Sequence, residues 1–438
     1  MKVGVVSLGC AKNRVDTEEM LSLLSEAGYG LTDDPAKAEV LIVNTCGFIT
    51  PAKEESIDAI FEMAQYKETG ACKVLAVTGC LAQRYADALM EQIPQIDVLV
   101  GVTQYDTLAD AIGRALKGGE RQQNTQRNNM FLHCGRVLTT PPYSAYIRIG
   151  EGCDNRCAYC AIPLIRGGHR SRPEQDILEE MRTLAGQGVK EHILIAQDTT
   201  RWGRDLQAGT LQGLLRKAAR VPGVQWLRLL YCYPDETDQA LIDEMTSHPN
   251  VCRYLDLPLQ HAVPRVLKAM NRRGDIVQIE ELLHYARDKG FALRTTFIVG
   301  FPGETEEEFQ QLLDFTARVR FDRMGAFAFS PEEDTAAALL PGQIPEQTKK
   351  HRLDRLMALQ ADISLQRNQQ RVGSTERVLI TGRQGSRYTA RSAWEAPDAD
   401  GLIYVDAQKK LVPGAFAEVC ITGAQTYDLT ACLLEECP

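Results

Sequence analysis

The sequence contains no run of about 18 consecutive apolar residues, the length that a helix needs to cross a membrane. Residues 1–10 also lack the apolar core of a signal peptide, because their apolar stretch is short and polar residues follow it. Positive charge is scarce, with 49 Lys and Arg against 58 Asp and Glu and a net charge of −9. Non-specific nucleic-acid binding depends on Lys and Arg against phosphate. We therefore expect a cytoplasmic protein without a membrane span and without stable nucleic-acid binding.

Cysteine, by contrast, is abundant, with thirteen residues in the chain. The cytosol keeps thiols reduced, so this number predicts metal binding or catalysis and not a disulfide framework. Cys153, Cys157 and Cys160 are spaced Cys-x3-Cys-x2-Cys, and no fourth Cys or His is convincingly placed beside them. A structural zinc site needs four ligands. Three thiolates can instead hold a 4Fe-4S cubane and leave one iron open to a ligand. A zinc loop or three buried thiols is the simpler alternative.

This spacing, with Tyr159 just before the last cysteine, resembles the radical S-adenosylmethionine (SAM) enzymes. The resemblance implies that Cys153, Cys157 and Cys160 hold a SAM-cleaving 4Fe-4S cluster whose open iron chelates the cofactor. It also implies that Tyr159 packs near the adenine of SAM. Cleavage of SAM then yields a radical.

At 438 residues the chain is long enough for two or three domains. Residues 118–129 are rich in Gln, Asn, Arg and Gly and have no apolar periodicity, which predicts a linker. We expect three domains, at residues 1–135, 140–370 and 371–438.

The first domain repeats one pattern, a short apolar run that ends in a cysteine. The runs are residues 3–10, 40–46 and 73–80, and they end in Cys10, Cys46 and Cys80. Helical patterns at 17–27 and 54–67 alternate with them, which predicts a doubly wound α/β domain. One cysteine at a strand end is usually a small buried hydrophobe. Three should gather at the carboxyl edge of a parallel sheet, where they could share a metal centre, again a cubane with one open iron.

The central domain contains six strand-like runs with helical patterns between them. The runs are residues 143–149, 192–196, 226–231, 254–257, 294–299 and 323–329. Six βα units are too few for an eightfold barrel, and the radical-SAM resemblance implies a partial (β/α)6 barrel. The resemblance also suggests SAM-binding residues at the strand ends, namely Gln197, Gln260, Gly300, Gly303 and Glu304. Turn and helix-cap roles explain these groups equally well.

The last domain has strand patterns at residues 377–381, 388–394, 402–405 and 416–421, which predict a small β-barrel. It resembles the TRAM domain. Residues 371–438 hold seven Lys and Arg against nine Asp and Glu. An RNA-binding module would normally be basic, so this balance favours docking to a basic protein.

Three cysteines in a domain before a radical-SAM core resemble the methylthiotransferase family. Several short segments resemble its ribosomal-protein branch, RimO, more than its tRNA branch, MiaB: residues 8–13, 161–167, 196–200, 230–234 and 257–261. The resemblance implies that Cys10, Cys46 and Cys80 hold a second 4Fe-4S cluster, which presents sulfur. It implies a methylthio group added to the β-carbon of an aspartate of ribosomal protein S-twelve, with flavodoxin or ferredoxin as reductant. A MiaB-like tRNA adenosine methylthiotransferase and an iron–sulfur electron carrier are the alternatives.

Overall fold

The computed structural model describes residues 1–127, 131–132, 134–207 and 209–437. The chain forms two compact units. The first comprises Met1–Thr139, Gly150–Arg172 and Ser330–Ala338, and the second comprises Thr140–Ile149, Pro173–Phe329 and Leu339–Pro438. Both cysteine sets singled out in the sequence therefore belong to the first unit. The domain limits expected from the sequence stay a prediction. Within the described ranges, no helix combines the length and apolar character that crossing a membrane requires.

The first unit is built on a six-stranded parallel sheet in the order β2-β1-β3-β4-β5-β6. Its strands are β1 (Lys2–Ser7), β2 (Gly30–Leu31), β3 (Val40–Thr45), β4 (Val74–Gly79), β5 (Val98–Val100) and β6 (Gln122–Asn124). Its main helices are α1 (Ala11–Glu26), α2 (Thr50–Ala64), α4 (Cys80–Arg84), α5 (Ala86–Gln92), α6 (Leu108–Leu116) and α7 (Ile162–Arg166), with a short α3 (Tyr66–Thr69).

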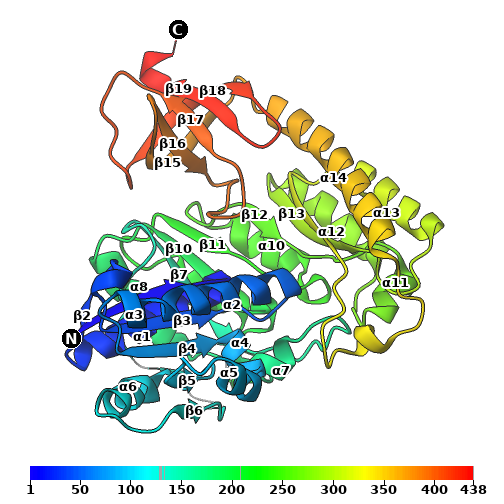
Figure 1. Ribbon diagram of the computed structural model, residues 1–438. Coiled ribbons are helices and arrows are strands. Elements are labelled where there is room, and N and C mark those ends of the chain that lie inside the picture. Colours follow the sequence, from blue (N-terminus) through cyan, green and yellow to red (C-terminus); the bar gives the residue numbers. More distant parts are fainter. Residues whose placement is uncertain (128–130, 133, 208, 438) are drawn as a thin grey trace. The chain divides into compact units, whose positions relative to one another are not determined.

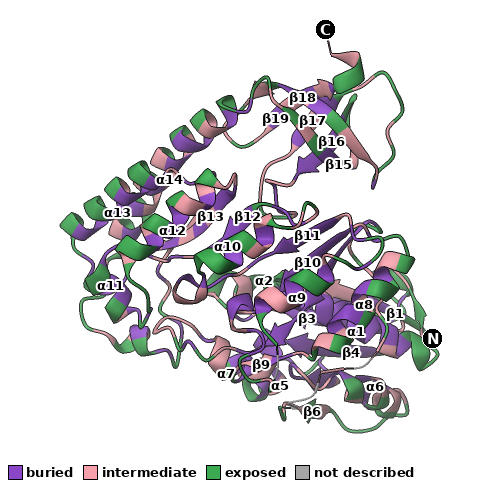
Figure 2. Cartoon of the chain, turned by 180° about the vertical axis from the view of Figure 1, so that it is seen from behind, coloured by how far each residue is buried: buried purple, intermediate pink, exposed green. Residues whose placement is uncertain are grey.

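Alternate residues of the strands point into two separate cores, one on each face of this sheet. Leu41, Leu75 and Leu99 pack with side chains of α2, α4 and α5. Val40 and Val98 pack with side chains of α1 and α6. Because β3 and β4 are buried along their whole length, each begins with four consecutive apolar residues. The prediction of a doubly wound α/β domain is confirmed (Figures 1 and 2).

The linker predicted at residues 118–129 is wrong in part, because β6 pairs in parallel with β5 inside it. Residues 128 and 129 of that stretch lie outside the described residues. Arg121 secures the start of β6 by donating hydrogen bonds to the carbonyls of Ile96 (2.6 Å) and Ile93 (2.8 Å). The sequence analysis did not predict β6 because its residues are polar, and a strand at the edge of a sheet needs few apolar residues.

The second unit contains the partial barrel, made of two three-stranded parallel sheets in the orders β11-β10-β7 and β12-β13-β14. The strands are β7 (Ser144–Arg148), β10 (Glu191–Ile195), β11 (Trp226–Leu229), β12 (Tyr254–Asp256), β13 (Ala292–Val299) and β14 (Arg323–Ala328). The helices are α8 (Glu174–Gly186), α9 (Leu211–Ala218), α10 (Gln239–Thr246), α11 (Pro264–Ala269), α12 (Ile276–Asp288), α13 (Glu306–Val319) and α14 (Glu346–Gln369). An isolated parallel bridge joins Leu227 of β11 to Val251, which lies three residues before β12. The expected six-stranded arrangement is confirmed.

Residues 371–437 form a closed barrel of five strands in the order β15-β16-β17-β19-β18. The strands are β15 (Thr375–Gln384), β16 (Arg387–Ser392), β17 (Ile403–Asp406), β18 (Phe416–Ala424) and β19 (Leu429–Leu433). The sequence predicted four of these strands and missed β19. A disulfide joins Cys432, in β19, to Cys437, and the eleven other cysteines are free thiols. The chain thus has one disulfide near its end and no disulfide framework.

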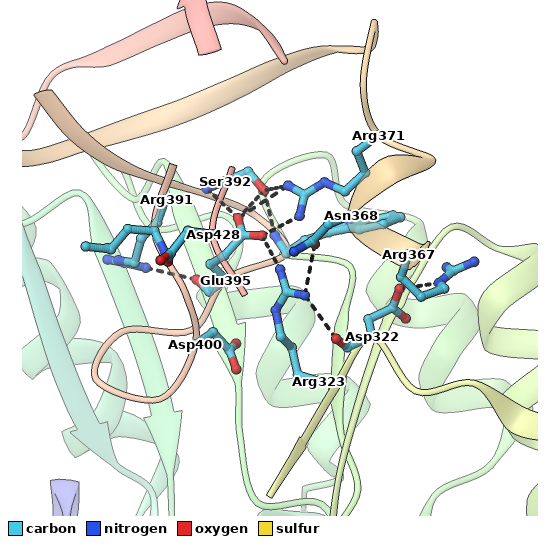
Figure 3. Close-up of polar contacts among 12 residues, drawn as sticks. Asp322, Arg323, Arg367, Asn368, Arg371, Arg391, Ser392, Glu395, Asp400 and Asp428 are labelled. Atoms are coloured by element: carbon cyan, nitrogen blue, oxygen red, sulfur yellow. Dashed lines mark hydrogen bonds and ion pairs between the residues drawn. The ribbon is translucent and has the colours of Figure 1, made fainter. Parts of the chain in front are cut away.

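Two buried carboxylates attach this small barrel to the partial barrel of the same unit. Glu395 accepts hydrogen bonds from Arg323 (2.9 Å), from Arg371 and from the Ser392 hydroxyl (2.7 Å), as Figure 3 shows. Glu191, at the start of β10, accepts from Arg391 (2.6 Å) of β16. Both carboxylates are almost fully buried and each is paired with arginine, the condition under which buried charge is tolerated.

Candidate functional site

The first cysteine set lies at one edge of the sheet in the first unit. Cys10 caps the start of α1 after β1, Cys46 follows β3, and Cys80 is the first residue of α4 after β4. Because β1, β3 and β4 are adjacent strands, their carboxyl ends place the three residues close together. A Cβ added to Gly9 would lie 3.2 Å from Cys46 Sγ, which shows how closely the loops approach. The placement expected from the sequence is therefore present, and the metal-ligand role stays a prediction.

Buried polar side chains hold these strand ends in position. Asn13 donates from Nδ2 to the carbonyls of Leu8 (3.0 Å) and Thr45 (2.9 Å), the residues before Gly9 and Cys46. Asn44 donates to the carbonyl of Asn13 (2.8 Å). The hydroxyl of Ser56 accepts from the Cys46 N–H (2.9 Å). The sequence analysis did not identify these hydrogen bonds. Both asparagines are fully buried, and burying an amide is costly unless it is hydrogen-bonded, so their bonds are needed where they lie.

Gly79 is required at the end of β4, since its φ is +95° and an added Cβ would lie 2.4 Å from both Asn44 Oδ1 and the Thr45 carbonyl. We expect Gly79→Ala to destabilise the first unit by about 2–4 kcal/mol, because a strained φ costs about 1–3 kcal/mol and overpacking adds to it. Thermal unfolding of iron-free protein measures this. Gly28→Ala is the matched control, because Gly28 has φ +87° but nothing within 4 Å of the added Cβ. Equal losses in the two variants would contradict the steric argument.

The three thiols differ in their surroundings. Cys10 is exposed, Cys46 is intermediate and Cys80 is buried. Burial raises the pKa of the Cys80 thiol to about 12, and the nearby Arg166 guanidinium opposes this rise. Burial also raises the pKa of Cys46. Without a metal the thiols of Cys46 and Cys80 stay protonated near neutral pH, so formation of their thiolates has to be coupled to metal binding.

The second cysteine set lies in the loop that follows β8 (Gly150–Glu151). The antiparallel pair of β8 with β9 (Arg170–Ser171) closes the base of this loop. Within it, the Cys153 N–H donates to the Gly167 carbonyl (3.1 Å) and the Cys160 N–H donates to the Cys157 carbonyl (3.0 Å). All three thiols are partly exposed, so the loop presents them at its surface.

The donor set of both groups fits iron–sulfur chemistry better than a single metal ion. Across the described ranges, no three His, Cys, Asp or Glu side chains are arranged around one ion. A cubane binds each thiolate at a different iron, so its ligands surround a volume and need not converge on a point. Each set supplies three thiols from the first unit, the number that a cubane with one open iron takes, and the ligand role stays a prediction.

The tentative SAM-binding residues fall in both units, with Tyr159 in the first and the other five in the second. Gln197 follows β10, and Gln260 follows β12 with φ +72° and a backbone hydrogen bond to Thr296 (2.8 Å). Gly303 has open space around its Cβ position except for Arg265 at 3.9 Å. Their contacts with SAM stay a prediction.

Gly300 and Glu304 have structural partners that the sequence did not reveal. A Cβ on Gly300 would lie 2.4 Å from Cγ of Lys349, so the glycine makes room for α14. Glu304 accepts from the N–H groups of Gly300 (2.8 Å) and Phe301 (3.2 Å) and from Arg352 (2.9 Å). Burial raises the pKa of Glu304 to about 7. The two residues thus shape the turn after β13.

Three regions of the chain match family models. Residues 2–101 match uncharacterized protein family UPF0004, residues 147–316 match the radical SAM superfamily and residues 372–433 match the TRAM domain. These regions coincide with the doubly wound sheet, most of the partial barrel and the small closed barrel.

The chain is also similar to named proteins over nearly its whole length. It is 49% identical over 98% of both chains to the ribosomal protein uS12 methylthiotransferase RimO of Desulforamulus reducens. It is 50% identical to the protein of the same name from Pelotomaculum thermopropionicum, again over 98% of both chains. Among solved structures, the radical SAM methyltransferase TsrM of Kitasatospora setae, with cobalamin and a [4Fe-4S] cluster bound, is 16% identical. It matches with a TM-score of 0.57 over 77% of this chain and 74% of its own, a likeness of fold.

Proposed function

Because the chain belongs to the RimO family of radical SAM methylthiotransferases, we propose that it adds a methylthio group to the β-carbon of an aspartate in ribosomal protein S-twelve (uS12). The main support for this proposal is the identity of 49% and 50%, over 98% of the chain, to two proteins named ribosomal protein uS12 methylthiotransferase RimO. Because these alignments cover 98% of the chain, they include all three regions that match family models.

Each cysteine set has a separate role in this proposal. Cys153, Cys157 and Cys160 would hold the cluster that cleaves SAM, and Cys10, Cys46 and Cys80 would hold the auxiliary cluster. When bound, the two 4Fe-4S clusters and SAM supply radical hydrogen abstraction from an unactivated carbon and a source of sulfur and methyl. The chain's own residues orient the ligands. Asn13, Asn44 and Ser56 fix the strand ends that carry the auxiliary set, and the β8–β9 pair fixes the other loop.

The small barrel supports a protein partner over a nucleic acid. Four of its seven basic residues are paired with carboxylates: Arg371 with Glu376 and Glu395, Arg391 with Glu191, Arg387 with Asp406, and Lys409 with Glu435. Arg371 and Arg391 are buried in their pairs and so are not presented to a phosphate, and the seven basic residues of the barrel are outnumbered by nine acidic ones. We propose a cytoplasmic enzyme that meets a basic ribosomal protein, without stable RNA binding, and that takes electrons from a flavodoxin or ferredoxin.

Mass spectrometry of the modified substrate tests the proposal. Anaerobically reconstituted protein with SAM and a reductant is offered a peptide from the aspartate loop of uS12 or, separately, a tRNA. We expect the peptide aspartate to gain the mass of a methylthio group and the tRNA to stay unchanged. A peptide with Asn in place of that aspartate is the matched control. Modification of the tRNA alone would favour the MiaB alternative, and an electron carrier would cleave no SAM.

A further inference from the structure

Arg166 is a buried arginine of the first unit that contacts Cys80 of the auxiliary set. It ends α7, six residues after Cys160, and only 2% of its surface is exposed. Its Nη2 lies 3.6 Å from the sulfur of Cys80 and donates to Asn13 Oδ1 at 2.7 Å. The same side chain therefore touches a thiol of the auxiliary set and the asparagine that holds the strand ends around it.

Two buried carboxylates orient this guanidinium. Asp16 Oδ2 accepts from Nη2 at 2.8 Å, and Glu151 accepts from Nη1 through both oxygens at 3.1 and 3.2 Å. Asp16 belongs to α1, which begins at the cysteine loop after β1, and Glu151 belongs to β8. An arginine presents its donors in a rigid planar fork. With both ends of the fork bonded to carboxylates, Nη2 cannot turn away from Cys80.

A purely structural ion pair would explain part of this arrangement. Buried carboxylate–arginine pairs do join elements, and losing one partner is costly. Such a pair does not require contact with a thiol, however, and here one nitrogen serves Asp16, Asn13 and the Cys80 sulfur together. Net charge and hydrogen bonds to sulfur are among the factors that set the reduction potential of an iron–sulfur cluster.

We propose that Arg166 is a positioning residue that holds positive charge and an N–H donor against the Cys80 sulfur and thereby raises the reduction potential of the auxiliary cluster. This inference rests on the proposed function, because it takes Cys10, Cys46 and Cys80 as the ligands of that cluster. Reduction adds negative charge to the cluster, so a nearby cation favours the reduced form. Asp16 opposes the effect by offsetting part of the arginine's charge.

The test isolates the auxiliary cluster and measures its potential. The full chain carrying C153A, C157A and C160A is reconstituted anaerobically and titrated with reductant while the cluster is followed by electron paramagnetic resonance. We expect Arg166→Gln to shift the potential to a more negative value. A tenfold change in the ratio of reduced to oxidised cluster, which is about 59 mV for a one-electron couple, is the size expected. Arg166→Lys keeps the positive charge, so its reduction potential should lie close to that of the parent chain.

Asp16→Asn supplies a change of opposite sign. Removing this carboxylate leaves the arginine's charge less compensated, so the potential should become more positive. A merely structural role predicts no such reversal between the two variants. Arg136→Gln is the matched control, because the Arg136 side chain is also buried in this unit, at 4% exposed, but pairs with Glu18 of α1. Its potential should equal that of the parent chain.

The outcomes separate the inference from the proposed function. If the cluster assembles and neither Arg166→Gln nor Asp16→Asn changes its reduction potential, the inference is wrong and the proposed function is unaffected. If Arg166→Gln cannot hold the cluster, Asp16→Asn decides, and an unchanged or more negative potential there overturns the inference. If the parent chain with intact Cys10, Cys46 and Cys80 assembles no cluster, the auxiliary site itself is wrong, and the inference with it.

Discussion

Replacing Cys10, Cys46 and Cys80 together with alanine is expected to abolish methylthio transfer while SAM cleavage continues. The two cysteine sets lie on different loops, so the loop at Cys153–Cys160 can still hold its own cluster. Iron content should fall from about eight to about four per chain, because one of two four-iron clusters is lost. Product from the uS12 peptide should fall to the background of the assay. Iron analysis and mass spectrometry of the peptide and of cleaved SAM measure the three quantities.

Cys72→Ala is the control for this experiment. Cys72 is a buried free thiol of the same unit whose Sγ lies 3.4 Å from the Val74 carbonyl, and it belongs to neither cysteine set. We expect full iron content and both activities in that variant. A triple variant that still transfers the methylthio group would contradict the auxiliary role of the three cysteines. A triple variant that no longer cleaves SAM would contradict the independence of the two sites.

Glu395→Gln is expected to lower the free energy of unfolding by about 3–5 kcal/mol, the usual cost of breaking a buried ion pair from one side. Glu395 is 1% exposed and accepts from Arg323, Arg371 and Ser392 (Figure 3). The amide would leave both arginines buried with less compensation. Urea unfolding, monitored by hydrogen exchange of the amides in β15–β19, measures the decrease in the free energy of unfolding. Asp406→Asn is the matched control, because its pair with Arg387 is about half exposed and contributes only about 0–1 kcal/mol.

The same variant has a defined dependence on pH. Burial by itself would raise the pKa of Glu395, but Arg371 and Arg323 lower it well below its ordinary value. A carboxylate whose folded pKa is lowered stabilises the fold above its unfolded pKa, about 4.3, and loses that contribution as the pH falls. The difference between the native chain and Glu395→Gln should therefore be constant from about pH 6 to 8 and shrink below about pH 4. A difference that grows on acidification would contradict the ion-pair assignment.

Where sequence patterns succeeded, burial on one or both faces controlled the residue types. The apolar runs of β3 and β4 and the six strand runs of the partial barrel are visible because parallel strands in a covered sheet must be apolar. Sequence patterns fail to predict an element whose buried residues are polar. Helix α14 has buried positions at helical spacing, but many of them are polar, including Lys349, Arg352, Gln360 and Asn368. Apolar periodicity cannot detect such a helix, so its contact with Gly300 was not foreseen.

The sequence by itself determined the fold class, the family and the two sets of three cysteines, because short spacings and strand-end positions are local properties of a chain. Only the tertiary structure decided what surrounds them. Arg166 is far from Asn13, Asp16 and Cys80 in the chain and meets them through the packing of α7. The partners of Glu395 likewise come from β14 and from residue 371. Such contacts arise from long-range packing, which no local pattern encodes, and they set the charge around each buried group.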